Sequence, residues 1–184
     1  MPNRISKDEY YLGIAEAVSK RSTCLRRQYG AVIVKDDRII ATGYNGSARG
    51  EPNCCDVGEC WREAHNIPHG EQYEKCAAVH AEDNAISQAG MNAIGATLYL
   101  AGFENGLKIE GKPCLMCERK IKNAQIADVV TWTQQAIDKV DKKVRVPVDE
   151  LIFTRKFIHD NGLEYAMLAA WEKWSGERKE NAID

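Results

Sequence analysis

The chain has 184 residues, of which 44% are hydrophobic and 28% are charged, and its formal net charge at pH 7 is −2. These values fit a single domain over residues 1–184 and give no global basic field for a polynucleotide, so we expect a small-molecule partner and no nucleic acid. No apolar run approaches the roughly 18 residues that cross a bilayer, and no signal-like apolar core follows the first residues, so we expect a cytoplasmic protein without membrane contact.

The first 47 residues predict a helix followed by a hairpin. Residues 7–20 carry apolar side chains at helical spacing. Residues 30–35 and 38–43 are two β-branched runs that flank an acidic pair, which is the pattern of a hairpin with that pair in its turn. The Gly-Tyr-Asn-Gly-Ser segment 43–47 leaves two interpretations open: a turn, because Asn and Gly tolerate positive φ, or a ligand-binding loop at a strand end.

The segment at about 48–76 is a cysteine-rich insert without clear periodicity. Roughly 25 irregular residues are unusual in a compact domain unless something holds them in place. Seven cysteines are many for a cytosolic chain, in which disulfides are disfavoured. We therefore expect a metal to hold the insert, which has four cysteines and two histidines in or beside it: Cys54, Cys55, Cys60, Cys76, His65 and His69.

After the insert, helical and strand patterns alternate. The predicted elements are a helix at 76–89, a strand at 96–101, a turn-rich linker at 103–112, a helix at 114–122 and a strand at 126–132. His80 falls near the first turns of one helix, and Pro113 stands where the other begins. This alternation predicts an α/β sandwich with some parallel strand pairing.

The C-terminal segment at about 133–184 has a weaker pattern. Residues 144–148 predict a short edge strand, because Pro147 disfavours a central one. Residues 163–174 place Leu and Trp side chains at helical spacing, which is typical of core or of a subunit contact.

Two motifs carry the chemistry: His80-Ala81-Glu82 and Pro113-Cys114-Leu115-Met116-Cys117. One histidine and two cysteines supply three ligands, the number found in the open site of a catalytic zinc. Glu82 is close enough to carry protons for a zinc-activated water. His-x-Glu alone says little, and Cys-x-x-Cys alone is equally typical of redox or structural zinc sites, but the joint pattern is typical of zinc-dependent nucleobase deaminases.

Further matching segments extend this likeness over about residues 5–132: Ser22-Thr23-Cys24, 30–34, 43–47, Asn53-Cys54, 79–86 and 113–117. Through them the chain resembles the deoxycytidylate (dCMP) deaminase family of the cytidine deaminase-like superfamily. The resemblance implies a three-layer α/β/α sandwich around a five-stranded mixed sheet. It also implies zinc-dependent hydrolysis of dCMP to dUMP and ammonia, a step in pyrimidine deoxynucleotide metabolism.

The resemblance also implies roles for particular residues. By motif position, His80, Cys114 and Cys117 would hold the catalytic zinc, and Glu82 would be the proton shuttle. Asn45 would contact the sugar, and we add Ser47 and Arg26 as candidate substrate contacts. The wider set of candidates for the phosphate is Arg4, Arg26, Arg27 and Lys112.

A second, structural zinc is implied by relatives that hold one with cysteines matching Cys24 and Cys54. Cys60 and Cys76 would complete the ligand set here, with His65, His69 and Cys55 in reserve. The alternative is that these are reduced cysteines packed as small hydrophobes. Many members of the family form hexamers and respond to dCTP and dTTP, which implies a homo-oligomer and a Mg²⁺ that accompanies a regulatory nucleotide.

The chain departs from the family pattern at residues 101–112 and after residue 132, so other functions remain open. The first alternative is the same chemistry on another base, nucleoside or nucleotide. The second is a tRNA or single-strand editor, which the net charge disfavours. The third is a zinc-stabilised binding protein without turnover, which has no use for an unligated Glu82.

Overall fold

The computed structural model describes residues 4–68 and 70–133. In chain order the elements are α1 (Lys7–Ser19), β1 (Arg27–Lys35), β2 (Arg38–Tyr44), β3 (Gly46–Ser47), α2 (Cys54–Val57), α3 (Trp61–Ala64), the 3-10 helix η1 (Tyr73–Lys75), β4 (Ala78–Val79), α4 (Ala81–Ala89), the 3-10 helix η2 (Gly90–Ala93), β5 (Thr97–Glu104), β6 (Leu107–Ile109), α5 (Leu115–Asn123) and β7 (Asp128–Thr131). The strand predicted at 144–148 and the helical stripe at 163–174 lie outside the described residues. No helix in the described part of the chain is long and apolar enough to cross a membrane.

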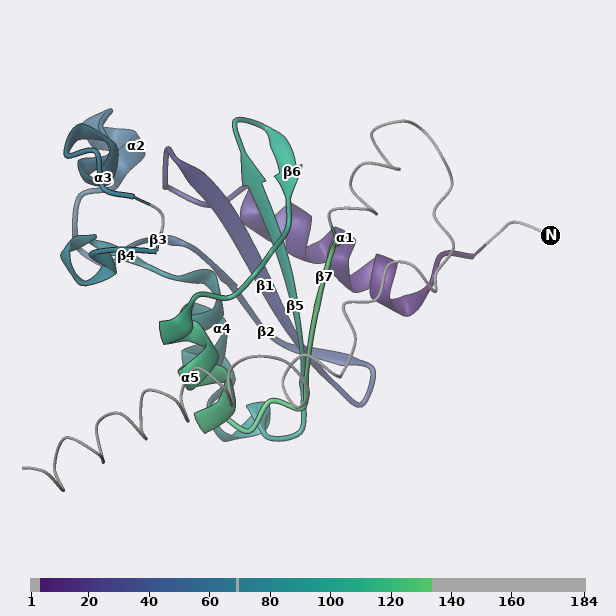
Figure 1. Ribbon diagram of the computed structural model, residues 1–184. Coiled ribbons are helices and arrows are strands. Elements are labelled where there is room, and N and C mark those ends of the chain that lie inside the picture. The colour runs from purple at the N-terminus through teal and green to yellow at the C-terminus, as the bar shows by residue number, and fades with distance from the viewer. Residues whose placement is uncertain (1–3, 69, 134–184) are drawn as a thin grey trace, which may run out of the picture.

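A five-stranded mixed sheet organises the molecule (Figure 1). β2, β1 and β5 are antiparallel neighbours, and the remaining edge of β5 is shared by two strands. β6 pairs antiparallel with residues 102–104, and β7 pairs parallel with residues 97–100. The prediction of a five-stranded mixed sheet is therefore confirmed.

Helices cover both faces of this sheet, which confirms the three-layer sandwich. α1 begins with a capping box between Ser6 and Glu9, and its buried face packs with Val32 and Tyr99 of the sheet. α4 and α5 cover the opposite face, and Figure 1 shows α1 on the far side of the strands from them. Glycines allow the helices to approach closely: a Cβ on Gly30 would lie 2.1 Å from the carbonyl oxygen of Ala15.

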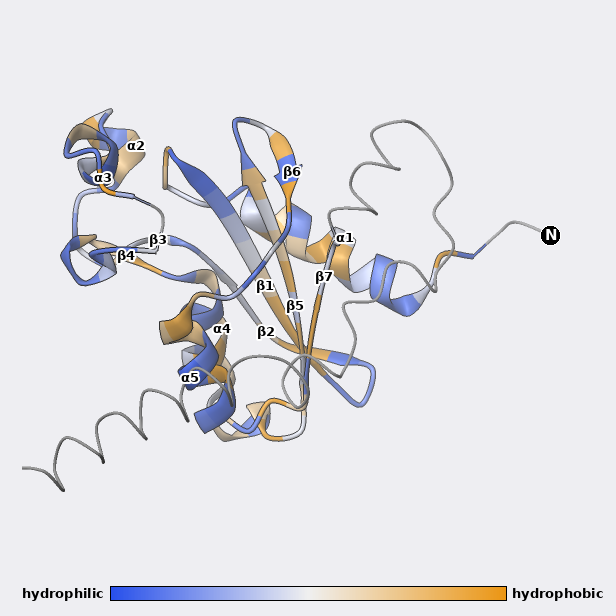
Figure 2. Cartoon of the chain, in the orientation of Figure 1, coloured by the Kyte–Doolittle hydropathy of each residue, from blue (hydrophilic) through white to orange (hydrophobic). Residues whose placement is uncertain are grey.

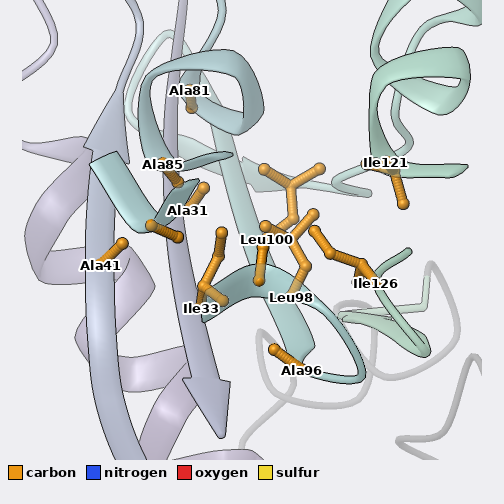
Figure 3. Packing of buried hydrophobic residues seen from close by; sticks show 12 residues of the cluster. Ala31, Ile33, Ala41, Ala81, Ala85, Ala96, Leu98, Leu100, Ile121 and Ile126 are labelled. Atoms are coloured by element: carbon orange, nitrogen blue, oxygen red, sulfur yellow. The ribbon is translucent and has the colours of Figure 1, made fainter. Parts of the chain in front are cut away.

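The larger core lies between the sheet and α4 and α5. Leu98 and Leu100 of β5 point toward Ile121 of α5 and Ile126 (Figure 3), and all four are buried. Each such side chain contributes roughly 1.5–3 kcal/mol on burial. Figure 2 shows the same division along β1. Its first residues are hydrophilic, and the buried residues that follow them are hydrophobic. The hydrophilic end of β1 is the end at which the insert lies (Figure 1).

The prediction of a helix over 76–89 is wrong at its beginning. Cys76 has extended dihedrals, and β4 pairs with β3 in the register Gly46 to Val79. α4 starts only at Ala81, and His80 is its N-cap residue rather than a member of its first turns. The non-local pairing of β3 with β4 outweighs the helical spacing of this short segment.

The prediction of a turn-rich linker over 103–112 is also wrong. β5 continues to Glu104, and a two-residue Asn105-Gly106 turn leads into β6. Both turn residues have positive φ, 52° and 77°. Asn-Gly is the sequence that a two-residue hairpin turn of this kind prefers, so the signal was present in the sequence.

The interpretation of residues 43–47 as a turn is wrong as well. None of these residues has a positive φ, and the segment runs from β2 through Asn45 into β3. The glycines are needed for close approach instead. A Cβ on Gly43 would lie 2.3 Å from the carbonyl oxygen of Ala81, so Gly43 lets the start of α4 sit directly on β2.

Candidate active site

His80, Cys114 and Cys117 meet where α4 and α5 begin. His80 and Cys114 are the N-cap residues of α4 and α5, and Cys117 lies in the first turn of α5. The ligand atoms of all three lie within 4.8 Å of one another, and no other group of three candidate ligands within residues 4–68 and 70–133 is as close. An ion pair between Lys120 and Asp83 ties the two helices together beside this site.

The distances fit a tetrahedral zinc. His80 Nδ1 lies 3.4 Å from Cys114 Sγ and 3.3 Å from Cys117 Sγ. Tetrahedral ligands at normal Zn–S and Zn–N bond lengths stand about 3.6 Å apart. A hydrogen bond from Cys117 and another from His80 stabilise the Cys114 thiolate and hold the pKa of Cys114 far below that of a free thiol. The donor set therefore fits zinc, and Nδ1 is the ring nitrogen that faces the two sulfurs.

Glu82 occupies the first turn of α4, two residues after His80, and only 5% of it is exposed. Burial raises the pKa of Glu82, while its hydrogen bond with Cys117 and the nearby His80 favour the charged form. A buried carboxyl group with a raised pKa binds its proton more tightly than a free one, which suits a group that takes up a proton and passes it on. Glu82 is thus close to the three ligands without being counted among them.

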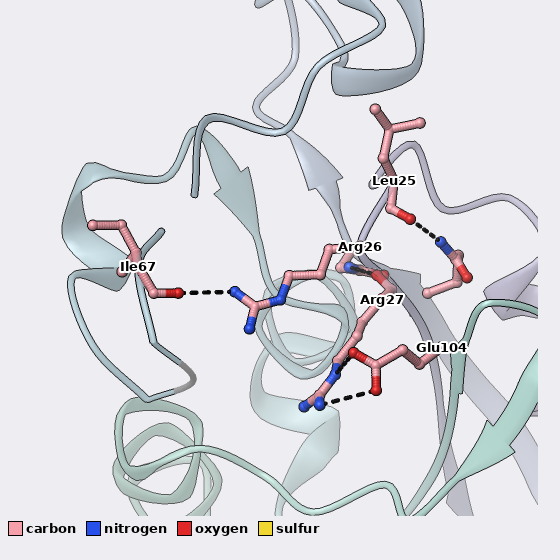
Figure 4. A network of polar contacts seen from close by, with 7 residues as sticks. Leu25, Arg26, Arg27, Ile67 and Glu104 are labelled. Atoms are coloured by element: carbon pink, nitrogen blue, oxygen red, sulfur yellow. Dashed lines mark hydrogen bonds and ion pairs between the residues drawn. The ribbon is translucent and has the colours of Figure 1, made fainter. Parts of the chain in front are cut away.

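One cavity of about 740 Å³ opens onto this site, and its walls are rich in cations. His80, Glu82 and Cys114 lie on its wall, together with the basic residues Arg26, Arg27, Arg62, Lys112 and Arg119. Arg26 donates to the carbonyl oxygen of Ile67, and Arg27 forms two bonds of 2.9 and 3.1 Å with Glu104 (Figure 4). The carboxyl groups of Glu74, Glu82 and Glu118 also line the cavity, so its basic residues exceed its acidic ones by two, which favours an anionic ligand.

Asn45 lines the cavity, and the backbone of β1 fixes its amide. Its Oδ1 accepts from the backbone N–H of Tyr29 at 2.7 Å, and its Nδ2 donates to the carbonyl oxygen of Arg27 at 2.8 Å. An amide has two lone pairs and two N–H bonds, so one of each is left for another partner. Asn45 is therefore held rigidly at the cavity wall.

Two other candidate substrate contacts lie away from this wall. Ser47 is not a cavity-lining residue, and its hydroxyl is buried without a hydrogen-bond partner among the described residues. Arg4 lines a different cavity, beside Lys7 and Asp37. Of the candidates for a phosphate, Arg26, Arg27 and Lys112 are the ones that share a cavity with His80.

The four cysteines predicted to hold a second zinc share the same cavity. Cys24, Cys54, Cys60 and Cys76 all line it, and the backbone N–H of Cys55 donates to the carbonyl oxygen of Thr23 at 3.1 Å. Burial and the nearby sulfurs of Cys54 and Cys76 raise the pKa of Cys24 to about 12. Their sulfurs do not reach the mutual closeness of the His80 group.

The cavity residues that sequence reasoning missed include Tyr29, Arg62 and Tyr73. Arg62 and Tyr73 lie in the insert, which has no periodicity from which a buried position could be recognised. Tyr29 lies just before the apolar run of β1, and its place on the cavity wall depends on the tertiary arrangement.

Comparisons with known proteins agree with this geometry. Residues 5–133 match the family model described as the cytidine and deoxycytidylate deaminase zinc-binding region. A deoxycytidylate deaminase of Schizosaccharomyces pombe is 38% identical over 141 residues, which cover 74% of this chain and 41% of that protein. A deoxycytidylate deaminase of Mycobacterium phage D29 is 40% identical over 128 residues, which cover 67% of this chain and 91% of the phage protein.

Among solved structures, the dCMP deaminase of the cyanophage S-TIM5 in its apo form matches with a TM-score of 0.51 and 26% identity. The match covers 76% of this chain and 94% of the phage protein. The chain thus spans nearly the whole of two phage proteins but less than half of the yeast one.

Proposed function

Because the chain belongs to the cytidine and deoxycytidylate deaminase zinc-binding family, we propose that it hydrolyses dCMP to dUMP and ammonia. The observation that carries the proposal is the grouping of His80, Cys114 and Cys117 beside the buried carboxyl group of Glu82, on the wall of a cationic cavity. A zinc-stabilised binding protein would not need a buried, unligated carboxyl group at this position.

We propose that His80 Nδ1 and the sulfurs of Cys114 and Cys117 hold the zinc. Three protein ligands would leave one position for water, and a bound zinc would supply a hydroxide nucleophile near neutral pH. Glu82 takes the proton of the attacking water and passes it to N3 of the cytosine ring, which makes C4 more electrophilic. After the oxygen has bonded to C4, Glu82 takes the remaining hydroxyl proton and delivers it to the 4-amino nitrogen, so that the C4–N bond breaks, ammonia leaves and C4 keeps a carbonyl oxygen.

The cationic wall supports a nucleotide rather than a nucleoside as the substrate. Five basic side chains face the cavity, and a monophosphate brings about two negative charges at neutral pH. We propose that Arg26 contacts this phosphate, because its hydrogen-bond acceptor is the neutral carbonyl oxygen of Ile67. Asn45 contacts the sugar through the lone pair and the N–H that β1 leaves available.

A panel of substrates tests the proposal. Ammonia release is measured with dCMP, CMP, dCTP, deoxycytidine, cytidine, guanine and adenosine at equal concentration. We expect dCMP to have the highest kcat/KM and deoxycytidine to be at least tenfold poorer, since each charge-assisted hydrogen bond contributes roughly 1.5–3 kcal/mol. If another compound has the highest kcat/KM, dCMP is not the substrate. If none of the compounds is turned over, the chain is not this enzyme.

We also propose a structural zinc at Cys24, Cys54, Cys60 and Cys76. Their shared position on one cavity wall and the electrostatic influence of three of them on Cys24 support this. A closed four-sulfur site would hold the irregular insert, as structural zincs do. Metal analysis should give about two zincs per chain, and the double variant Cys24→Ser with Cys54→Ser should give about one. A value of about one in the unmodified protein would exclude this site.

The remaining proposals concern assembly and location. We propose a cytoplasmic homo-oligomer, such as a hexamer, that responds to a dNTP with Mg²⁺. Light scattering with and without dCTP and MgCl₂ measures the mass, and a monomer under both conditions would contradict the oligomer.

A further inference from the structure

Arg62 is buried inside the otherwise irregular insert, with only 5% of it exposed. Its guanidinium donates to the carbonyl oxygen of Glu71 at 2.5 Å and to that of Pro68 at 2.6 Å. These two bonds tie α3 to the segment that leads from the insert toward α4. A buried arginine with two carbonyl partners holds its guanidinium in one orientation.

The orientation of Arg62 is passed on to an aromatic ring. The guanidinium carbon lies 4.4 Å from the centroid of the Tyr73 ring, within the range of a cation–π contact. The Tyr73 ring in turn lies 5.0 Å from the His80 ring, at an interplanar angle of 86°. Arg62, Tyr73 and His80 therefore form a continuous packed chain from the insert to the metal-binding imidazole, and all three line the cavity.

His80 needs such support because of its position. It is the N-cap of α4, with extended dihedrals, and lies outside the rigid part of the helix. A metal-binding histidine is usually oriented by a hydrogen bond from its second ring nitrogen. Within the described residues, the hydrogen-bond contacts of the His80 ring run only from Nδ1 to the two sulfurs. Ring packing is then the contact that sets the rotation of the imidazole.

We infer that Tyr73 is a positioning residue that directs His80 Nδ1 toward Cys114 and Cys117, and that Arg62 holds Tyr73 in place. The insert is thereby a structural part of the catalytic metal site, and not only a surface elaboration. The role assigned to Tyr73 rests on the proposed zinc ligation by His80, but it does not depend on which nucleotide is the substrate.

Two variants of Tyr73 test this inference without any substrate. Zinc affinity is measured by competition with a chromophoric chelator, and the ligand geometry by the d–d absorption of the Co²⁺-substituted protein. Tyr73→Phe keeps the ring and should keep both properties. Tyr73→Leu removes the ring and should weaken catalytic zinc binding about 10- to 100-fold, the range for losing a residue that orients a ligand. The Co²⁺ spectrum should change with it.

A matched control separates positioning from general loss of insert structure. Trp61 stacks on His65 in the same insert, with ring centroids 4.4 Å apart, and is removed by Trp61→Leu. We expect Trp61→Leu to leave zinc affinity within about twofold of the parent. Equal weakening by Trp61→Leu and Tyr73→Leu, or a Tyr73→Leu protein with unchanged affinity and spectrum, would overturn the inference.

Arg62→Lys covers the case in which Tyr73→Leu does not fold. Lysine keeps the charge but cannot donate to two carbonyl groups in the fixed geometry of a guanidinium. Arg62→Lys should lower the zinc affinity by a smaller factor than Tyr73→Leu, and an unchanged affinity would count against the inference. An unmodified protein that binds zinc but deaminates none of the panel would refute the proposed function and leave this inference intact.

Discussion

Glu82→Gln is the sharpest test of the proposed mechanism, because it changes one atom in a buried side chain. Glutamine keeps the volume and the position in the first turn of α4, where Glu82 is 5% exposed. It cannot accept and release a proton near neutral pH. The variant therefore removes the proton shuttle and leaves the three proposed ligands in place.

The expected loss follows from the number of proton transfers. Positioned acid–base groups contribute typically 10²- to 10⁴-fold each, and Glu82 is assigned a transfer to the ring and a transfer to the leaving group. We expect kcat to fall by on the order of 10⁴-fold or more, which corresponds to about 5.4 kcal/mol of activation free energy. Zinc content should not change, because Glu82 is not a ligand.

The same substitution should make folding less sensitive to pH. Burial raises the pKa of Glu82, so the folded protein holds this proton more tightly than the unfolded chain. Stability is then lost as pH rises from the usual carboxyl pKa toward the raised one. With zinc removed by a chelator, Glu82→Gln should flatten this decline and should not lower the free energy of unfolding.

The assay is steady-state ammonia release from dCMP, alongside zinc analysis of the same preparations. Glu118→Gln is the matched control, since Glu118 is a second buried carboxyl group on the cavity wall and burial also raises its pKa. It should reduce kcat by less than about tenfold, because it has no part in the proton path. A Glu82→Gln enzyme with more than a hundredth of the parent kcat and full zinc content would refute the mechanism.

Three further predictions concern packing, the metal and the phosphate. Gly43→Ala should lower the free energy of unfolding by about 1–3 kcal/mol in urea titrations, since its Cβ would meet the backbone of α4 at 2.3 Å. Gly13→Ala is the control, because a Cβ there meets nothing within 4 Å and should not destabilise the protein. Equal stabilities of the two variants would contradict the close approach of α4. Dialysis against a strong chelator should lower the melting temperature and abolish turnover, with recovery on adding Zn²⁺ but not Mg²⁺, and a chelated protein that keeps full activity would exclude zinc catalysis. Arg26→Gln should raise KM for dCMP at least tenfold and leave deoxycytidine kinetics nearly unchanged, and an equal effect on both substrates would exclude a phosphate contact.

The grouping of the proposed zinc ligands was predictable from the sequence, because ligand chemistry restricts the residue types and the helix start restricts their spacing. Cys114 and Cys117 stand at the N-cap and in the first turn of one helix, so a three-residue step is enough to bring both sulfurs to one side. The alternation of helix and strand likewise predicted an α/β sandwich, and the resemblance to the family implied its three layers. The beginning of α4 was not predictable, because it depends on the pairing of Gly46 with Val79, more than 30 residues away.

The insert resisted prediction for a different reason. Arg62 is buried without lying on the apolar face of any long helix, and its partners are the carbonyl oxygens of Pro68 and Glu71. A charged residue in an irregular segment is expected to be exposed to solvent unless its hydrogen-bond partners are known. Contacts of this kind leave no periodic pattern, and only the fold shows that the insert reaches His80.

The hairpin of β5 and β6, which overlaps the divergent residues 101–112, contacts the cavity wall. Its first strand, β5, places Glu104 beside Arg27. The two hydrogen bonds of this half-buried ion pair fix the guanidinium of Arg27 on the cavity wall. A paired carboxylate offsets the charge of Arg27, so the cationic character of that wall shifts toward Arg26, whose partner is a neutral carbonyl. The divergent hairpin therefore acts on the Arg27 side of the cavity, next to the end that we propose for the phosphate.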